Sequence, residues 1–138
     1  MPSKIIPEGF KDDVSSQATV ENIFKNLMID NFQLNGFRLV KTPLIEFVDK
    51  DTEKNVFKII NSKNEKKLYV RDDITLQVAR LSETRLYKKK KPLKLCYYGE
   101  VTRKKGSILR PERQFLQIGA ECIGEKNFLA DVEMMELA

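Results

Sequence analysis

The 138-residue chain contains no histidine, and this absence excludes several classes of function. Ser-His and Cys-His catalysis cannot be built from this chain alone, because no imidazole is present to act as the base. The only two cysteines, Cys96 and Cys122, do not have the spacing of metal ligands, and without histidine a mixed zinc site is excluded too. We therefore expect no metal and no other cofactor, and we expect both cysteines to be reduced, buried thiols.

The sequence also lacks a long apolar run. None approaches the roughly 20 residues that span a bilayer, and the N-terminus lacks the basic-then-apolar pattern of a signal peptide. These absences predict a cytoplasmic protein with no membrane partner. A content of 41% hydrophobic and 33% charged residues is typical of one soluble domain with a core. The net charge of +5 favours anionic partners, but a solvated basic surface is its commoner explanation.

Two predicted strands around a basic loop form the centre of the sequence, in the stretch LCYYGEVTRKKGSILRPERQFLQIGAECIG. The first strand, at 95–98, is rich in residues that suit a pleated, buried surface, and the second, at 115–123, alternates around a central glycine. The loop between them has the charge of an anion-binding loop, supplied by Arg103, Lys104, Lys105, Arg110 and Arg113, with Gly106 among them.

The second strand places polar groups on one face only. Residues two apart on a strand point to the same side, so Gln117, Gly119 and Glu121 share one face. The other face is apolar and carries Leu116, Ile118, Ala120 and Cys122. An amide and a carboxylate beside a glycine gap are typical of the floor of a small-molecule site, since a buried charge without partners is costly. The alternative, which the alternation alone favours, is an antiparallel sheet with one solvated side.

A long first helix is predicted from the 3.6-residue spacing of apolar residues. It runs from Ser15 or Ser16, whose hydroxyl is expected to cap it, to about Leu34, before the stop signal formed by Asn35 and Gly36. Its apolar residues are expected to lie in the core, namely Val20, Ile23, Phe24, Leu27, Met28 and Phe32.

A second helix follows within RDDITLQVARL, where Asp73 is well placed to cap it. The expected inward positions are Ile74, Val78, Leu81 and the stem of Arg85. An aspartate at position 73 is explained equally well by helix capping alone and by a role in binding a ligand. The four lysines at 88–91, after this helix, are typical of solvated surface, with a nucleic-acid contact as the less frequent alternative.

The remaining segments are a strand at 37–40, a hairpin and a last helix. Pro43 follows the strand and cannot donate to a central ladder, so it marks an edge or a bend. The apolar residues after it, which either cover another subunit or pack within the chain, are Leu44, Ile45, Phe47 and Val48. Strands at 56–60 and 67–70 are predicted to pair as a hairpin. The last helix begins near Asn127 and meets no stop signal, so we expect the chain to be either a fragment of a longer protein or a shortened gene product.

In their order, these segments resemble the catalytic core of histidyl-tRNA synthetase and, more closely, its paralogue, the regulatory subunit of short-form ATP phosphoribosyltransferase. The segments that carry the resemblance are IPEGF, GFRLVKTPLIEF, FKII, YVRDDITLQVAR, LKLCYYGEVTR, QFLQIGAECIG and ADVEMMELA. The resemblance implies that residues 1–138 form the incomplete, N-terminal portion of an α+β domain of the class II aminoacyl-tRNA synthetase type, an antiparallel sheet flanked by helices. It also implies a homodimer interface around Pro43.

A remnant histidine pocket is implied by the same resemblance. In the synthetase, an acidic residue and a threonine hold the amino group of histidine, and a glutamine and a glutamate on the strand after the loop line the same pocket. These positions match Asp73, Thr75, Gln117 and Glu121 here. Arg103 matches the loop arginine that contacts the α-phosphate of ATP and the carboxylate of histidine. Carboxylates suit a cationic α-ammonium group, because charge-assisted hydrogen bonds are strong.

Departures from the synthetase pattern favour the non-catalytic paralogue. Lys105 stands where the synthetase loop has a glutamate, and this reversal of charge on the adenine side disfavours adenylate formation. The synthetase loop has another arginine further along. That position is Pro111 in this chain, although Arg110 lies beside it. Asp73 stands where the synthetase has glutamate, in a segment whose DxTxQVAR pattern is closer to the regulatory subunit.

The resemblance therefore implies a non-catalytic regulatory subunit that forms a homodimer and assembles with the short catalytic subunit of ATP phosphoribosyltransferase. It would be needed for the activity of that glycosyltransferase in the first step of histidine biosynthesis and would transmit feedback inhibition by histidine. One alternative is a fragment of a histidyl-tRNA synthetase, which activates histidine with ATP. The other is an RNA-binding or scaffold remnant that uses the lysines at 88–91; tRNA is not the expected partner.

Overall fold

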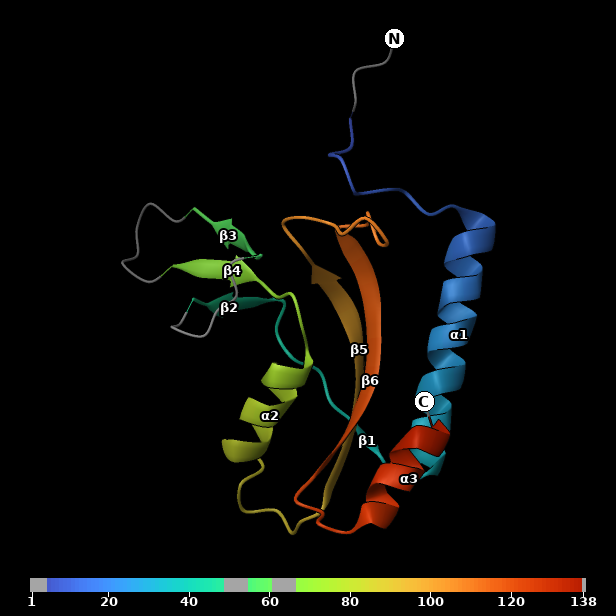
Figure 1. Ribbon diagram of the computed structural model, residues 1–138, viewed down its shortest axis with the longest axis vertical. Helices are drawn as coiled ribbons and strands as arrows, with labels where there is room; N and C mark the ends of the chain where they lie inside the picture. The colour runs from blue at the N-terminus through green and yellow to red at the C-terminus, as the bar shows by residue number, and fades with distance from the viewer. Residues whose placement is uncertain (1–4, 49–54, 61–66, 138) are drawn as a thin grey trace.

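The computed structural model of the chain describes residues 5–48, 55–60 and 67–137. Figure 1 shows its helices and strands in chain order. The helices are α1 (Ser15–Leu34), α2 (Thr75–Glu83) and α3 (Phe128–Leu137). The strands are β1 (Arg38–Leu39), β2 (Ile45–Phe47), β3 (Phe57–Ile59), β4 (Leu68–Val70), β5 (Leu93–Thr102) and β6 (Gln114–Ile123). No helix within the described residues is long and apolar enough to cross a membrane.

A long antiparallel pair of strands, β5 and β6, forms the centre of the fold. The two strands pair from Leu93 opposite Ile123 to Thr102 opposite Gln114, so β5 is longer than its predicted range. β1 adds to the other side of β5 in parallel, which the long connection through the second sheet and α2 permits. α1 and α3 cover one face of this sheet and α2 lies on the other (Figure 1). The predicted α+β class is confirmed, with the parallel β1 as an addition.

The predicted alternation of the central strands is confirmed, because their two faces pack against different helices. On the α2 side, Leu95, Tyr97 and Val101 join Ile74 and Val78 in one buried cluster. On the α1 side, the second buried cluster consists of Ile29, Phe32, Phe37 and Cys96. Ile118 and Ala120 of β6 pack against that second cluster. Cys96 and Cys122 are free thiols; Cys96 is buried and Cys122 is only half-buried.

The smaller sheet has the strand order β2-β4-β3 and includes the predicted hairpin. β3 and β4 pair antiparallel, from Phe57 opposite Val70 to Ile59 opposite Leu68. The polar connection at 61–66 lies outside the described residues. β2 is an edge strand of this sheet, and Pro43 lies in the segment that leads into it, as predicted.

The prediction that the apolar residues of α1 form core is wrong for four of them. Val20, Ile23, Phe24 and Leu27 are between 53% and 66% exposed, whereas Phe32 is buried as predicted. The reason is that α1 packs on the sheet through its C-terminal half, where the Phe32 and Phe37 rings lie 5.9 Å apart. Its N-terminal half runs alongside the sheet (Figure 1), but the apolar side chains there stay largely exposed.

The helix ends also correct some of the predictions. α1 begins after Val14, and no side chain caps it, so neither predicted serine hydroxyl does so. The stop at Gly36 is confirmed, since its φ of +86° is a conformation that glycine adopts readily. In α2, Ile74 and Val78 are buried as predicted, but Arg85 lies beyond the end of the helix and is exposed.

Candidate functional site

The N-terminus of α2 is joined to β6 by a carboxylate and an amide. Gln117 Nε2 donates to Asp73 Oδ1 over 2.8 Å, and the backbone N–H of Thr75 donates to the same oxygen over 3.0 Å. The amide is used at both ends, because Gln117 Oε1 accepts from the backbone N–H of Ile74 over 3.0 Å. Asp73 therefore binds the start of α2, as predicted, and is also oriented by β6. Helix capping and ligand binding, the two roles that the sequence left open for Asp73, are therefore compatible.

Asp73 keeps its negative charge in this setting. Burial raises the pKa of its carboxyl, but hydrogen bonds from Gln117, from the backbone of Thr75 and Ile74 and from the Thr75 hydroxyl outweigh burial, so the pKa lies below its usual value. These donors are all neutral, so they stabilise the charge without cancelling it. The result is an ionised carboxylate at the N-terminus of α2, suited to a cationic ligand group.

Thr75 and Glu121 are connected through a residue that the sequence analysis missed. Tyr97 OH donates to Glu121 Oε1 over 3.1 Å, and it lies 2.9 Å from Thr75 Oγ1. A Cβ at Gly119 would come within 2.5 Å of the Tyr97 hydroxyl, so the ring occupies the space that the glycine leaves. The glycine gap is therefore filled by Tyr97 and is not an open floor. The strand register explains this contact, because Tyr97 lies opposite Gly119. An alignment of the two strands as an antiparallel pair would have predicted the contact from the sequence.

The basic loop is fastened to the hairpin by Asn55, a second residue that the sequence analysis missed. The Asn55 carbonyl accepts from the backbone N–H of Lys104 over 3.0 Å. Its side chain binds both backbone groups of Lys105, accepting from the N–H over 2.8 Å and donating to the carbonyl over 3.1 Å. The loop thus has a defined path, although the side chains of Arg103, Lys104 and Lys105 are exposed.

Arg113 differs from the other loop cations because it is used for packing. Its guanidinium carbon lies 4.7 Å from the ring centre of Phe57 and 5.2 Å from that of Phe10. Its Nη1 donates to the Glu8 carbonyl over 2.8 Å. Arg113 therefore ties the N-terminal segment and the hairpin to the loop, a structural role that the sequence analysis did not predict.

A cavity of about 660 Å³ opens between the N-terminus of α2, β6 and the basic loop. Four of the five predicted site residues line it, namely Asp73, Thr75, Arg103 and Gln117. Glu121 is not among the residues that line it, and it is connected to Thr75 through the Tyr97 hydroxyl. Arg103 stacks on Phe115, with 5.1 Å between its guanidinium carbon and the ring centre. An anionic Asp73 and a cationic Arg103 on one cavity wall suit a small zwitterion, such as an α-amino acid.

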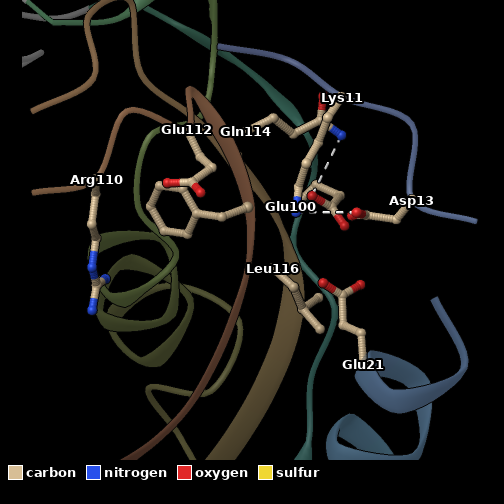
Figure 2. Close-up of a pocket in the computed structure, with 9 residues that line it drawn as sticks. Lys11, Asp13, Glu21, Glu100, Arg110, Glu112, Gln114 and Leu116 are labelled. Carbon is tan, nitrogen blue, oxygen red and sulfur yellow. Dashed lines mark hydrogen bonds and ion pairs between the residues drawn. The ribbon is translucent and has the colours of Figure 1, made fainter. Parts of the chain in front are cut away.

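Figure 2 shows a second cavity, of about 390 Å³. It adjoins the first cavity, with which it shares Arg110, Phe115 and Leu116. Its carboxylates come from the N-terminal segment, α1, β5 and the loop, as Asp13, Glu21, Glu100 and Glu112. Lys11 pairs with Asp13 at 3.1 Å, so this cation is already neutralised. The excess of carboxylates disfavours an anionic ligand group, and the first cavity is the better candidate site. Among the described residues, no group of three or more acidic or cysteine side chains is placed to hold a metal ion.

Comparison with known protein families decides the family of this chain. Residues 9–138 match the family described as histidyl-tRNA synthetase. The chain belongs to the histidyl-tRNA synthetase family. Within it, the chain is 38% identical to the ATP phosphoribosyltransferase regulatory subunit of Rhodospirillum centenum, over 97% of this chain and 36% of the relative. It is 40% identical to the protein of the same name in Rhodospirillum rubrum, over 87% of this chain and 33% of the relative.

Solved structures of the family agree with the class II fold. A structure described as an ATP phosphoribosyltransferase regulatory subunit/histidyl-tRNA synthetase from Bacillus halodurans matches with a TM-score of 0.81 at 26% identity, over 96% of this chain and 35% of that one. Apo histidyl-tRNA synthetase from S. aureus matches with a TM-score of 0.74 at 22% identity, over 96% of this chain and 32% of that one, and shows the fold alone. The chain spans about a third of the length of these relatives. The predicted resemblance to the synthetase and its regulatory paralogue is confirmed.

Proposed function

We propose that this chain contributes the synthetase-like part of a non-catalytic regulatory subunit of ATP phosphoribosyltransferase. The observation that carries the proposal is the 37–40% identity to three relatives of that name, over at least 87% of the chain. In this role it assembles with the short catalytic subunit and is needed for the reaction of ATP with phosphoribosyl pyrophosphate, the first step of histidine biosynthesis. Histidine is the effector that inhibits the assembly.

The cavity between α2, β6 and the basic loop is the proposed histidine site. In this proposal Asp73 binds the α-ammonium group and Arg103 binds the α-carboxylate. The proposal is supported by the fact that both residues line the cavity, together with Thr75 and Gln117. Glu121 is part of the site through Tyr97. For binding here to inhibit the enzyme, histidine must have higher affinity for the inactive assembly than for the active one, because a ligand shifts an equilibrium only by its differential affinity.

The loop supports a regulatory role over an enzymatic one. An exposed Lys105 replaces the glutamate that the synthetase resemblance calls for, so an acceptor is missing where adenylate formation needs one. A synthetase fragment is the second candidate, because the chain matches the synthetase family along nearly its whole length. The two are separated by histidine-dependent exchange of pyrophosphate into ATP, which a synthetase catalyses and a regulatory subunit does not.

We also propose a homodimer, with an apolar surface after Pro43 as its contact. Leu44, Ile45 and Phe47 are exposed in this structure, which supports burial against a second copy. The mass measured by sedimentation equilibrium at micromolar concentration is expected to be that of two chains or an even multiple. A monomer mass across that range would contradict the dimer.

The rate of phosphoribosyl-ATP formation tests the function. It is measured for a short-form catalytic subunit with and without this protein, as the cell makes it, and again with histidine added. We expect activation that histidine reverses. A folded sample that neither activates nor responds to histidine would contradict the proposal, and pyrophosphate exchange in the same sample would support the synthetase instead.

A further inference from the structure

Arg103, a cation that lines the large cavity, has a backbone that is held from two sides. Its N–H donates to the Arg113 carbonyl over 2.7 Å, and this bond continues the pairing of β5 and β6 beyond their ends. Its carbonyl accepts from Arg113 Nε over 3.4 Å, and the N–H of the same peptide group, that of Lys104, donates to the Asn55 carbonyl over 3.0 Å. Both polar groups of this peptide are therefore bound, which limits the directions that the Arg103 side chain can take.

The side chain of Asn55 strengthens this arrangement at the next residue of the loop. Its Oδ1 accepts from the backbone N–H of Lys105 and its Nδ2 donates to the Lys105 carbonyl, so the two backbone groups fix which way the amide points. Val56, which follows Asn55, is 2% exposed, so the asparagine is attached to a part of the hairpin that is anchored in the interior. Asn55 also lines the same cavity as Arg103.

We propose that Asn55 is a positioning residue: by holding the basic loop, it keeps the Arg103 guanidinium where it meets the carboxylate of the bound amino acid. This inference rests on the proposed histidine site and accounts for part of its specificity. Stacking uses the flat face of a guanidinium and not its N–H groups, so Arg103 can stack on Phe115 and still bind a carboxylate. A long side chain that is already placed loses less conformational freedom when the ligand binds, and the affinity is higher as a result.

The affinities for histidine and for histamine, which is histidine without its carboxylate, test this role by calorimetry with the protein as the cell makes it. Asn55→Ala removes both side-chain bonds to the loop, and Asn22→Ala, which changes an exposed asparagine of α1, is the matched control. We expect Asn55→Ala to weaken histidine binding about fivefold, the scale of one or two neutral hydrogen bonds, and to change histamine affinity less than about twofold. Asn22→Ala is expected to bind both ligands like the wild type.

A double variant separates positioning of Arg103 from a general packing role. Once the guanidinium is gone, Asn55 has nothing left to position. The double variant Asn55→Ala/Arg103→Ala is therefore expected to bind histidine as weakly as Arg103→Ala alone, within about twofold. A further loss of about fivefold in the double variant would overturn the positioning role, because independent effects add. Equal losses for histidine and histamine in Asn55→Ala, or unchanged histidine affinity, would overturn it as well.

Limited digestion with trypsin tests the hold on the loop without any ligand, because proteolysis reports local opening. Arg103, Lys104 and Lys105 are themselves cleavage sites for this protease, and we expect faster cleavage after them in Asn55→Ala than in the wild type or Asn22→Ala. Equal cleavage rates would overturn this inference and leave the proposed histidine site standing. A wild type that binds no histidine would overturn the proposed site, and the positioning role with it, whatever the cleavage rates.

Discussion

At the scale of single residues, the site combines positions that the sequence analysis predicted with two that it missed, Tyr97 and Asn55. Asp73, Thr75, Arg103 and Gln117 were predicted and line one cavity. Glu121 faces the predicted side of its strand but accepts a hydrogen bond from Tyr97, which the sequence analysis did not consider. Periodicity assigns a face to each residue, but it does not say which neighbour reaches across that face. That depends on strand register, which places Tyr97 opposite Gly119.

Asp73 also leads to a prediction about pH. Its pKa is lowered in the folded protein, so its ionised form contributes stability above the unfolded pKa of about 4, and that contribution is lost as the pH falls through the folded value. Asp73→Asn keeps an acceptor oxygen for Gln117 and Thr75 but removes the charge. The difference in free energy of unfolding between wild type and variant, from urea titrations, is expected to be constant from pH 7 to 5 and to shrink toward pH 3. A difference that grows on acidification would contradict this.

At the scale of elements, the hydrophobic pattern predicted the positions of the helices well. It predicted less well which helix faces are buried. α1 and α2 both follow the 3.6-residue period, and both exist close to their predicted ranges. Val78 of α2 and Ile74 just before it are buried against the sheet, but in α1 Val20, Phe24 and Leu27 are exposed. The period identifies an apolar face; the length of the sheet beside the helix decides how much of that face finds a partner in the same chain.

The packing of α2 can be tested with two substitutions on one helix turn. Ile74, at its start, is 1% exposed and contacts the central sheet, whereas Leu76 is 69% exposed. Ile74→Ala is expected to lower the free energy of unfolding by about 2–5 kcal/mol, as for other buried aliphatic residues. Leu76→Ala should change it by no more than about 0.5 kcal/mol. Comparable losses for both variants, measured by urea denaturation, would mean that α2 is not packed on β5 and β6 as described.

At the scale of the whole molecule, the order of the segments predicted the architecture. The resemblance to the synthetase family was carried by motifs spread along the chain, and the α+β class followed from it. The parallel pairing of β1 with β5 did not follow from the local pattern, because two residues of strand carry no signal for the direction of their partner. The exposed apolar face of α1 was also unexpected, since a pattern read along one chain contains no information about the molecule that covers it.

The central claim is that histidine binds in the cavity between α2, β6 and the basic loop. The most direct measurement is the dissociation constant of histidine for the wild type and for Asp73→Asn, with the exposed Asp131→Asn on α3 as the matched control. We predict that Asp73→Asn binds histidine at least tenfold more weakly, because a charge-assisted hydrogen bond to the ammonium group is lost, and that Asp131→Asn binds like the wild type. Equal affinity of all three proteins, each shown to be folded, would place the histidine site elsewhere and contradict the account.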